Sequence, residues 1–254
     1  MSKRRLPVIV PLLVLTLWFT NPSLAADKLR VATEGTYPPF SYLDDSGKLA
    51  GFDVDIAYAL CEAMTRECEV KAYAWSELLD RMEAGEYDMI VASMANTEER
   101  AKRVDFTDYY YRSHSIFAGR SDIKGTTPDD LADKTLAVGR DTIQEAFLSR
   151  HYPRSHILLT DNLPQAFQML LDGKADLMLS DTTNLLDLLQ QPEAEGFDFV
   201  GEPISSPDLQ SKAHIAVGKG NDALRRAVNK TLEELRLNGT YDRINRKYFP
   251  FSIY

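Results

Sequence analysis

The feature that most constrains the fold is a pattern that occurs twice along the chain, 88 residues apart. A helix-like segment is followed by Gly85, Asp88 and a short apolar run, and the same order returns with Gly173, Asp176 and a second apolar run. A helix that ends at a glycine and leads into an apolar strand is half of a β-α-β unit. The repetition predicts two similar α/β lobes, each with its own sheet. Two unrelated units within one sheet are the alternative.

Strand-like and helix-like segments alternate along the chain, which predicts mainly parallel sheets flanked by helices. Residues 29–33 alternate between apolar and polar as in a half-buried strand, and residues 89–92 form a short apolar strand of the kind buried on both faces. We expect Asp53 and Ser76 each to cap the helix that follows it, because short polar side chains accept the free N–H groups of a first turn.

The first 25 residues have the composition of a signal peptide. Lys3, Arg4 and Arg5 form a basic start, residues 6–19 are almost entirely apolar, and small residues precede a predicted cleavage site after Ala25. A membrane anchor is the alternative, but the apolar run is shorter than the roughly 20 residues of a spanning helix. We therefore expect an exported protein with the leader cleaved.

The formal net charge of −9 at pH 7 bears on the partners of the chain. Nucleic acids and anionic membranes are bound by basic patches, so an acidic chain argues against both. The histidines show no paired ligand spacing with acids or cysteines, so we expect no metal site. They lie at His114, His151, His156 and His214.

Cys61 and Cys68 are the two cysteines of the chain. In a cytosolic protein they would be free buried thiols, and two residues cannot build a zinc site. In an oxidising compartment a disulfide is favoured. Closing so short a loop would stabilise the fold by about 2.5 kcal/mol in the chain-entropy model.

Ligands of open α/β sheets lie beyond the carboxyl ends of the strands, next to helix N-termini. The repeated pattern places four such strand ends in this chain, at residues 34–37, 93–100, 140–143 and 180–181. Two lobes that present these ends to each other would form one cleft.

Several short motifs, in order along the chain, resemble those of a known family. They are residues 35–40 (GTYPPF), 51–56 (GFDVDI), 88–90 (DMI) with Arg100, 104–110 (VDFTDYY), 144–146 (QEA), 239–242 (GTYD) and 247–249 (KYF). With them the sequence resembles the family 3 periplasmic solute-binding proteins of ABC importers. The lysine/arginine/ornithine and histidine binders are the nearest relatives by this resemblance, and the spacing of the two cysteines resembles the disulfide of that subgroup.

The resemblance implies the two-lobed periplasmic binding protein fold of type II, with a hinge of two segments. Lobe one would comprise residues 27–112 plus 218–254 and lobe two residues 113–217, with the hinge near 112–116 and 213–217. It also implies a monomer without cofactor that closes around an amino acid, or a related amine or guanidino compound, and then docks on the membrane permease of an importer.

The resemblance assigns the two charged ends of an amino acid to opposite lobes. Arg100, one turn past a predicted N-cap at Thr97, would bind the carboxylate. Asp181 would bind the ammonium, helped by the carbonyl or hydroxyl of Ser93. The alternatives are a solvated arginine at position 100 and an aspartate at position 181 that only caps the following helix.

The ligand side chain would lie between Tyr37 and Trp75, which match the two aromatic walls of the family. Two aromatic faces around a cation supply roughly 0.5–2 kcal/mol each. Glu34 would meet the distal charge of a cationic side chain. Core packing is the alternative for Trp75, and a carboxylate bonded to its own turn is the alternative for Glu34.

Four positions depart from the family pattern. Ala92 and Ala95 replace hydroxyl residues, Ile143 replaces a threonine, and Asp141 stands where glycine is usual. The backbone N–H groups of Ala95 and Ile143 can still bind a carboxylate, so both remain predicted site residues. Asp141 adds a negative charge near the pocket mouth and favours a cationic ligand, but these departures leave the identity of the ligand open.

Two other functions stay open beside a binding protein for a polar, cationic amino acid. An exported enzyme on the same scaffold, such as a cyclohexadienyl dehydratase-like lyase, would need a general acid in the cleft, for which Glu34 or Asp141 would serve. A ligand-sensing partner of a membrane receptor is the other. The clamp of Arg100 and Asp181 would be partly unused in an enzyme, so we predict that the protein is not one.

Overall fold

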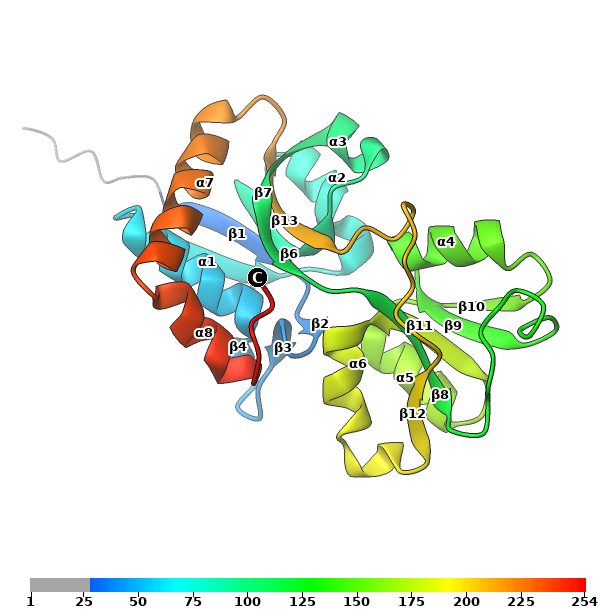
Figure 1. The fold of residues 1–254 in the computed structure, drawn as a ribbon. Helices are drawn as coiled ribbons and strands as arrows, with labels where there is room; N and C mark the ends of the chain where they lie inside the picture. Colours follow the sequence, from blue (N-terminus) through cyan, green and yellow to red (C-terminus); the bar gives the residue numbers. More distant parts are fainter. Residues whose placement is uncertain (1–27) are drawn as a thin grey trace, which may run out of the picture.

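Two five-stranded sheets, each flanked by helices, divide the chain into two lobes that lie side by side (Figure 1). The computed structural model describes residues 28–254, so the predicted signal peptide and its cleavage site after Ala25 lie outside the described residues. One strand in each sheet runs opposite to the other four, β13 in the first and β8 in the second. The predicted two-lobed α/β architecture with mainly parallel sheets is confirmed.

The first sheet has the strand order β5-β1-β6-β13-β7. Its strands are β1 (Leu29–Thr33), β5 (Cys68–Ala72), β6 (Met89–Ala95), β7 (Val104–Arg112) and β13 (Lys212–Gly218). A small sheet follows β1 and consists of β2 (Thr36–Tyr37), β3 (Ser41–Leu43) and β4 (Leu49–Ala50). Because β1 pairs in parallel with β6, their carboxyl ends share one edge of the sheet.

The second sheet has the equivalent order β10-β9-β11-β8-β12. Its strands are β8 (Ser115–Arg120), β9 (Thr135–Gly139), β10 (His156–Thr160), β11 (Leu177–Asp181) and β12 (Phe197–Val200). Here β9 pairs in parallel with β10 and β11, as β1 does with β5 and β6.

Helices cover both faces of each sheet. In lobe one they are α1 (Phe52–Ala63), α2 (Leu78–Glu83), α3 (Glu98–Arg103), α7 (Asp222–Leu237) and α8 (Thr240–Tyr248), with a short 3₁₀ turn at Trp75–Glu77. In lobe two they are α4 (Ile143–His151), α5 (Leu163–Leu171) and α6 (Thr182–Leu189), with a 3₁₀ turn at Pro192–Ala194. Alternate residues of one strand serve opposite cores: Val31 packs towards α1 and α7, and Ala32 packs towards α2.

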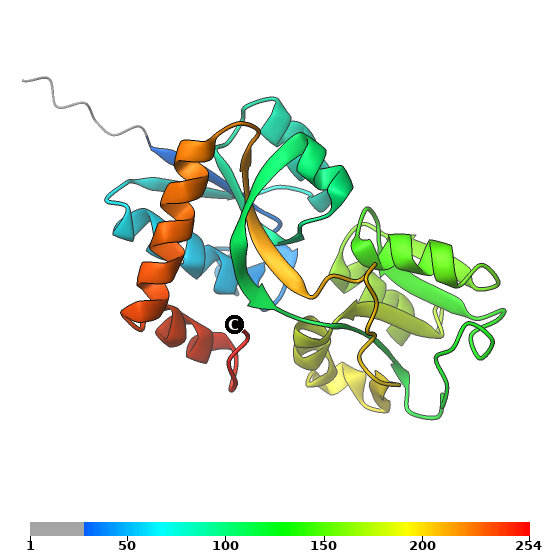
Figure 2. The ribbon, with the colours of Figure 1, turned by 45° about the horizontal axis from the view of Figure 1, so that its top comes forward.

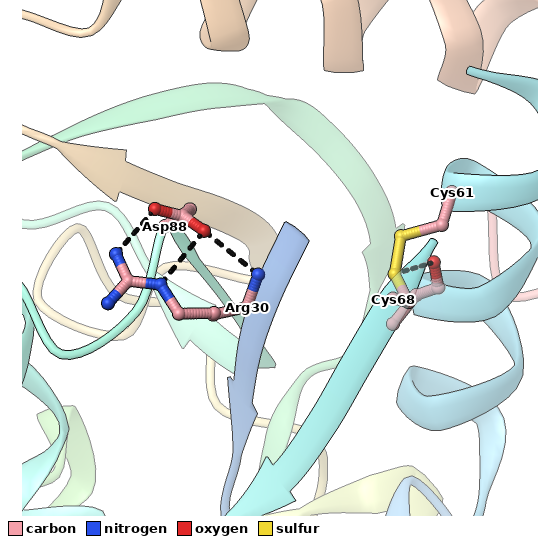
Figure 3. Close-up of a disulfide and its surroundings, with 5 residues drawn as sticks. Arg30, Cys61, Cys68 and Asp88 are labelled. Carbon is pink, nitrogen blue, oxygen red and sulfur yellow. Dashed lines mark hydrogen bonds and ion pairs between the residues drawn. A yellow bond between two sulfur atoms is a disulfide. The ribbon is translucent and has the colours of Figure 1, made fainter. Parts of the chain in front are cut away.

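The repeated pattern corresponds to equivalent hydrogen bonds in the two lobes. A carboxylate oxygen of Asp88 accepts the backbone N–H of Arg30 at 2.8 Å, shown in Figure 3, and that of Asp176 accepts the backbone N–H of Thr135 at 2.8 Å. Each aspartate thus fastens the start of the strand β6 or β11 to its neighbour β1 or β9. Gly85 and Gly173 have φ of 73° and 67°, so both helices end at a left-handed glycine.

Two segments of the chain cross between the lobes (Figure 2). Residues 113–114 connect β7 to β8, and residues 201–211 connect β12 to β13. The two crossings are joined where the backbone N–H of Ser113 donates to the carbonyl of Ser211 at 2.8 Å. Neither crossing segment belongs to a strand of the two sheets, as is expected of a hinge.

The structure places the boundary expected after residue 217 within a strand of the first sheet. Residues 213–217, expected to form the second hinge segment, lie within β13, which is hydrogen-bonded between β6 and β7. A strand bonded on both sides within the first sheet cannot serve as a hinge between lobes. We therefore propose that lobe one comprises residues 28–112 plus 212–254 and that lobe two lies between the crossings.

Two predicted helix caps are also wrong. Helix α1 begins at Phe52 with Gly51 as its N-cap, and Asp53 is fully buried, bonded instead to Tyr110 and Ser93. Partners from other elements therefore override the local rule. Ser76 lies inside the 3₁₀ turn, and the N-cap position of α2 belongs to the next residue, which makes no side-chain cap bond.

The predicted disulfide between Cys61 and Cys68 is present and joins the end of α1 to the start of β5 (Figure 3). The two Cα atoms lie 5.9 Å apart, within the usual range for such a bond. Within residues 28–254, none of the helices combines the length and the apolar character that crossing a bilayer requires.

Candidate ligand-binding site

A cavity lies between the two lobes and takes its lining from both. It brings together all eight residues predicted for the ligand site, which are Glu34, Tyr37, Trp75, Ser93, Ala95 and Arg100 of lobe one and Ile143 and Asp181 of lobe two. These residues come from separate strand ends and helix starts, so the fold and not the sequence distance puts them together. The cavity is the candidate site.

Arg100 lies in the short helix α3 and reaches the cavity from lobe one. Its backbone N–H donates to the hydroxyl of Thr97 at 3.2 Å, so the predicted N-cap is confirmed. Its guanidinium donates to the carbonyls of Ala95 at 3.1 Å and Asp141 at 2.9 Å. It forms no ion pair with a carboxylate among residues 28–254, and burial lowers its pKa to about 10 because desolvation disfavours the cation.

Asp181 is the last residue of β11 and faces the cavity from lobe two. It occupies the N-cap position of α6, but its side chain makes no capping bond there, so the predicted alternative of a simple helix cap is wrong. One carboxylate oxygen accepts the hydroxyl of Tyr37 at 2.7 Å, and the other accepts the side-chain amide of Gln144 at 3.1 Å. Burial raises the pKa of Asp181, and these two bonds partly oppose the shift.

Glu34 follows the last residue of β1 and is half-buried against the cavity. The hydroxyl of Thr36 donates to it at 2.8 Å. Glu34 is thus bonded to its own turn and also lines the cavity, so the two predicted readings are compatible. Burial raises the pKa of Glu34 to about 7, the bond from Thr36 opposes the shift, and the nearby Asp53 adds to it.

The two aromatic residues predicted as walls also form contacts between the lobes. The hydroxyl of Tyr37 donates across the cleft to Asp181, while its ring stacks on Phe40 at 5.9 Å between centroids. The indole N–H of Trp75 donates to the carbonyl of Asp141 at 3.2 Å, and the guanidinium of Arg100 lies 5.0 Å from the centroid of the indole ring. Trp75 packs at the edge of a core and lines the cavity at the same time.

Ser93 lines the cavity, but its hydroxyl is occupied elsewhere. The hydroxyl donates to Asp53 at 2.9 Å, and the backbone N–H of Ser93 donates to the hydroxyl of Tyr110 at 2.9 Å. Tyr110 in turn donates to the other oxygen of Asp53 at 2.6 Å. The hydroxyl of Ser93 is therefore engaged by Asp53, so of the two Ser93 groups expected to bind an ammonium only the backbone carbonyl is left.

The cavity has a guanidinium on one lobe and a carboxylate on the other. Comparison of the sequence with known protein families gives one match over nearly the whole chain. Residues 29–251 match the family model of bacterial extracellular solute-binding proteins, family 3. The chain belongs to this family.

Relatives of this family 3 protein are similar over nearly the whole chain. The L-arginine-binding protein of Pseudomonas aeruginosa is 35% identical over 92% of either chain, and the histidine-binding periplasmic protein of Escherichia coli is 30% identical over 89% of either. The solved structure of an ancestral arginine-binding protein bound to arginine has a TM-score of 0.82 at 33% identity, covering 89% of this chain and 99% of that one. The type II fold is therefore shown, and the protein is a binding protein and not an enzyme.

The four departures from the family pattern all lie at the cavity or its rim. Ala92, Ala95 and Ile143 line it, and Ile143 is the first residue of α4, so its backbone N–H has no acceptor within that helix. Asp141 is exposed and has φ of 60°, a left-handed conformation that favours glycine. Its carbonyl, which accepts from both Trp75 and Arg100, gives this position a role that does not depend on its side chain.

Sequence reasoning missed Gln144 and Tyr111 as parts of the family 3 site. Gln144 is buried and donates to both Asp181 and Ser115, and Tyr111 is buried beneath the cavity. Gln144 belongs to a motif that carried the resemblance, and Tyr111 directly follows another. Their position in or next to these motifs was the one signal in the sequence. Their partners come from distant segments, which the sequence does not show.

Proposed function

We propose that this protein is the periplasmic substrate-binding component of an amino-acid ABC importer and that it binds a cationic amino acid by closure of its lobes. The solute would lie in the cavity with its carboxylate on Arg100 and its ammonium on Asp181. Glu34 would meet the positive end of the side chain. The relatives named for arginine and histidine support this class of ligand.

The observation that carries the proposal is the pair of unmatched charges in the cavity. Arg100 is half-buried and bonds to carbonyls, and Asp181 is half-buried and bonds to neutral donors. Neither side chain forms an ion pair among residues 28–254. A partly desolvated charge without a counter-charge is unfavourable, and a zwitterionic ligand supplies one for each.

A cationic side chain on the ligand is supported by a third group. Glu34 is a half-buried carboxyl whose pKa is raised to about 7, so a nearby guanidinium or ammonium would favour its ionised form. Asp141 adds a carboxylate at the rim of the same cavity, whereas Asp161 of the lining pairs with Arg140 at 3.6 Å. Beside Asp181, the lining thus offers Glu34 as a second carboxylate for a positive charge.

The expected signal peptide and the family membership both support a role in transport. Relatives of this chain include a protein named as periplasmic, and the family is described as extracellular. Two segments crossing between otherwise separate sheets suit opening and closing of the cleft. The closed, liganded form would then be the one that docks on the membrane permease.

A thermal-shift screen tests the proposal directly. The purified protein, with residues 1–25 removed, is heated with each common amino acid, with guanidino compounds and with polyamines. A ligand present at 100 times its dissociation constant stabilises the folded state by about 2.7 kcal/mol. We expect the largest shifts with L-arginine, L-lysine or L-ornithine.

Two results would contradict the proposal at different levels. Larger shifts with neutral or acidic amino acids would remove the cationic class but keep amino-acid binding. No shift with any amino acid, confirmed by calorimetry, would remove the function as an amino-acid-binding protein.

A further inference from the structure

Apart from bonds made by the two crossing segments, four hydrogen bonds join the two lobes across the cleft, within the part of the chain that the structure describes. Two of them use the charged groups that the proposed ligand needs, Arg100 and Asp181. The bond from Trp75 uses an indole N–H and a backbone carbonyl instead. The fourth, from the side-chain amide of Asn184 to the carbonyl of Pro38 at 2.6 Å, lies outside the cavity lining altogether.

Asn184 is placed where it can act only on closure. It lies in the first turn of α6, three residues after Asp181, and is fully buried. Its amide nitrogen reaches Pro38, in the turn between β2 and β3 of lobe one, while its side-chain oxygen is buried without a partner. A fully buried amide that makes one bond, and makes it to the other lobe, has no evident role within its own lobe.

From these contacts we infer that Asn184 is a positioning residue that favours the closed arrangement of the lobes whether or not a ligand is bound. The inference rests on the proposed function for its effect on affinity. When the closed state holds the ligand, the measured dissociation constant is the intrinsic one divided by the fraction of protein in the closed state. A contact that never touches the ligand changes this fraction equally for every ligand.

The consequence separates two kinds of residue in the cleft. Glu34 and Arg100 would change the ranking of ligands, because each faces one part of the solute. Asn184 would change every affinity by the same factor and leave the ranking unaltered. One hydrogen bond of ordinary strength corresponds to roughly a threefold to tenfold change in such a factor.

The experiment compares the Asn184→Leu variant with the wild type. Leucine is close to asparagine in shape, removes the amide donor and leaves no buried polar atom on the side chain. Dissociation constants for L-arginine and L-lysine are measured by calorimetry, and the radius of gyration of the ligand-free protein is measured by small-angle X-ray scattering. We expect both dissociation constants to rise threefold to tenfold by the same factor, and the ligand-free radius of gyration to increase.

Two further variants guard the result. Asn184→Asp keeps the shape, removes the donor and places an oxygen against the carbonyl of Pro38, so it should weaken closure in the same direction even if leucine is poorly tolerated. Asn229→Ala removes a comparable bond, from the backbone N–H of Asp108 to an asparagine side chain within lobe one, and should change neither quantity.

The inference is overturned if both variants at position 184 leave the dissociation constants and the radius of gyration unchanged. It is also overturned if the two ligands lose affinity by different factors, since Asn184 would then act on the ligand. If the wild type binds no amino acid, the proposed function fails by that result alone. The scattering comparison of the ligand-free proteins then still decides the role of Asn184.

Discussion

The two lobes share a scaffold but differ in the chemistry at the ends of equivalent strands. Asp88 and Asp176 fasten the same two strands in each lobe with the same bond length, and a left-handed glycine precedes each of them. At the far end of those strands the equivalence stops: Ser93 stands in lobe one where Asp181 stands in lobe two, at the same offset of 88 residues. The bonds that build the fold are repeated, whereas the groups that face the cavity are not.

Because of this difference, the two walls of the cleft carry different charged groups. Lobe one contributes the guanidinium of Arg100 together with both aromatic rings and Glu34, and lobe two contributes Asp181 with Gln144 behind it. An amino acid, with opposite charges at one end, would fit between the lobes in one orientation only. Single substitutions should remove the difference between the lobes one group at a time.

The largest effect is expected from the cation of lobe one. Arg100→Ala should raise the dissociation constant for L-arginine about a hundredfold or more, because truncating one partner of a desolvated charge pair typically costs 2–5 kcal/mol. The variant should also stop distinguishing L-arginine from agmatine, which lacks the carboxylate. Calorimetric titration measures both. Arg103→Ala in the same helix, whose guanidinium pairs with Asp80 and Glu83 on the surface, should leave affinity unchanged.

The anion of lobe two should have the next largest effect. Asp181→Asn keeps oxygen and shape but loses the charge, so we expect roughly a thirtyfold loss of affinity for L-arginine, at the lower end of the range for such pairs. Asp172→Asn, an exposed carboxylate of the same lobe, is the matched control. Equal affinities of the Asp181 variant and the wild type would show that lobe two does not bind the ammonium.

Glu34 should affect only ligands with a positive side chain. Glu34→Gln should weaken L-arginine about tenfold and leave L-glutamine nearly unchanged. The pKa of Glu34 is about 7, so the carboxyl is mostly neutral at pH 6 and mostly ionised at pH 8. With the neutral form about tenfold weaker, as in Glu34→Gln, the wild-type affinity for L-arginine should rise about fivefold from pH 6 to pH 8.

The pH dependence separates Glu34 from its neighbour Asp53, whose pKa is also raised to about 7 by burial. In the Glu34→Gln variant the affinity for L-arginine should be almost the same at both pH values. A variant that keeps the full change would assign the titration to Asp53 or to another group.

The smallest effect concerns the bonds that the two lobes share. Asp88→Asn and Asp176→Asn should each lower the free energy of unfolding by about 1–2 kcal/mol, because each weakens the acceptor of the backbone bond and also removes a partly exposed ion pair, with Arg30 or with Lys134. Urea unfolding measures this loss. Affinity for L-arginine should stay the same in both variants; a large loss of affinity in either would mean that the repeated anchor also shapes the site.

Much of the fold could be predicted because the relevant signals are local. The repeated glycine and aspartate lie within one helix-strand unit, and the motifs at strand ends mark residues that the topology must bring to one edge. All eight predicted site residues therefore line one cavity. The ligand roles of these residues remain predictions, since they depend on a molecule that the sequence does not contain.

The errors arose where contacts between distant segments decide the outcome. Asp53 resembles a helix cap, but bonds from Tyr110 and Ser93 hold it inside the lobe. The end of lobe two is hard to place from the sequence because residues 212–218 join strands that lie a hundred residues or more earlier in the chain. Likewise, the bond from the amide of Asn184 to Pro38 joins segments 146 residues apart, which no local pattern marks.

The position of β13 bears on the order in which the lobes can form. In the first sheet β7 is an edge strand whose single neighbour is β13, and β13 separates it from β6. Until residues 212–218 are available, β7 has no place in the sheet, and α7 and α8 cannot cover its core. Lobe two is one continuous stretch and waits for no later segment, so when the chain emerges from its amino end this lobe is the first that can form completely. The lobe that carries Arg100 is completed last.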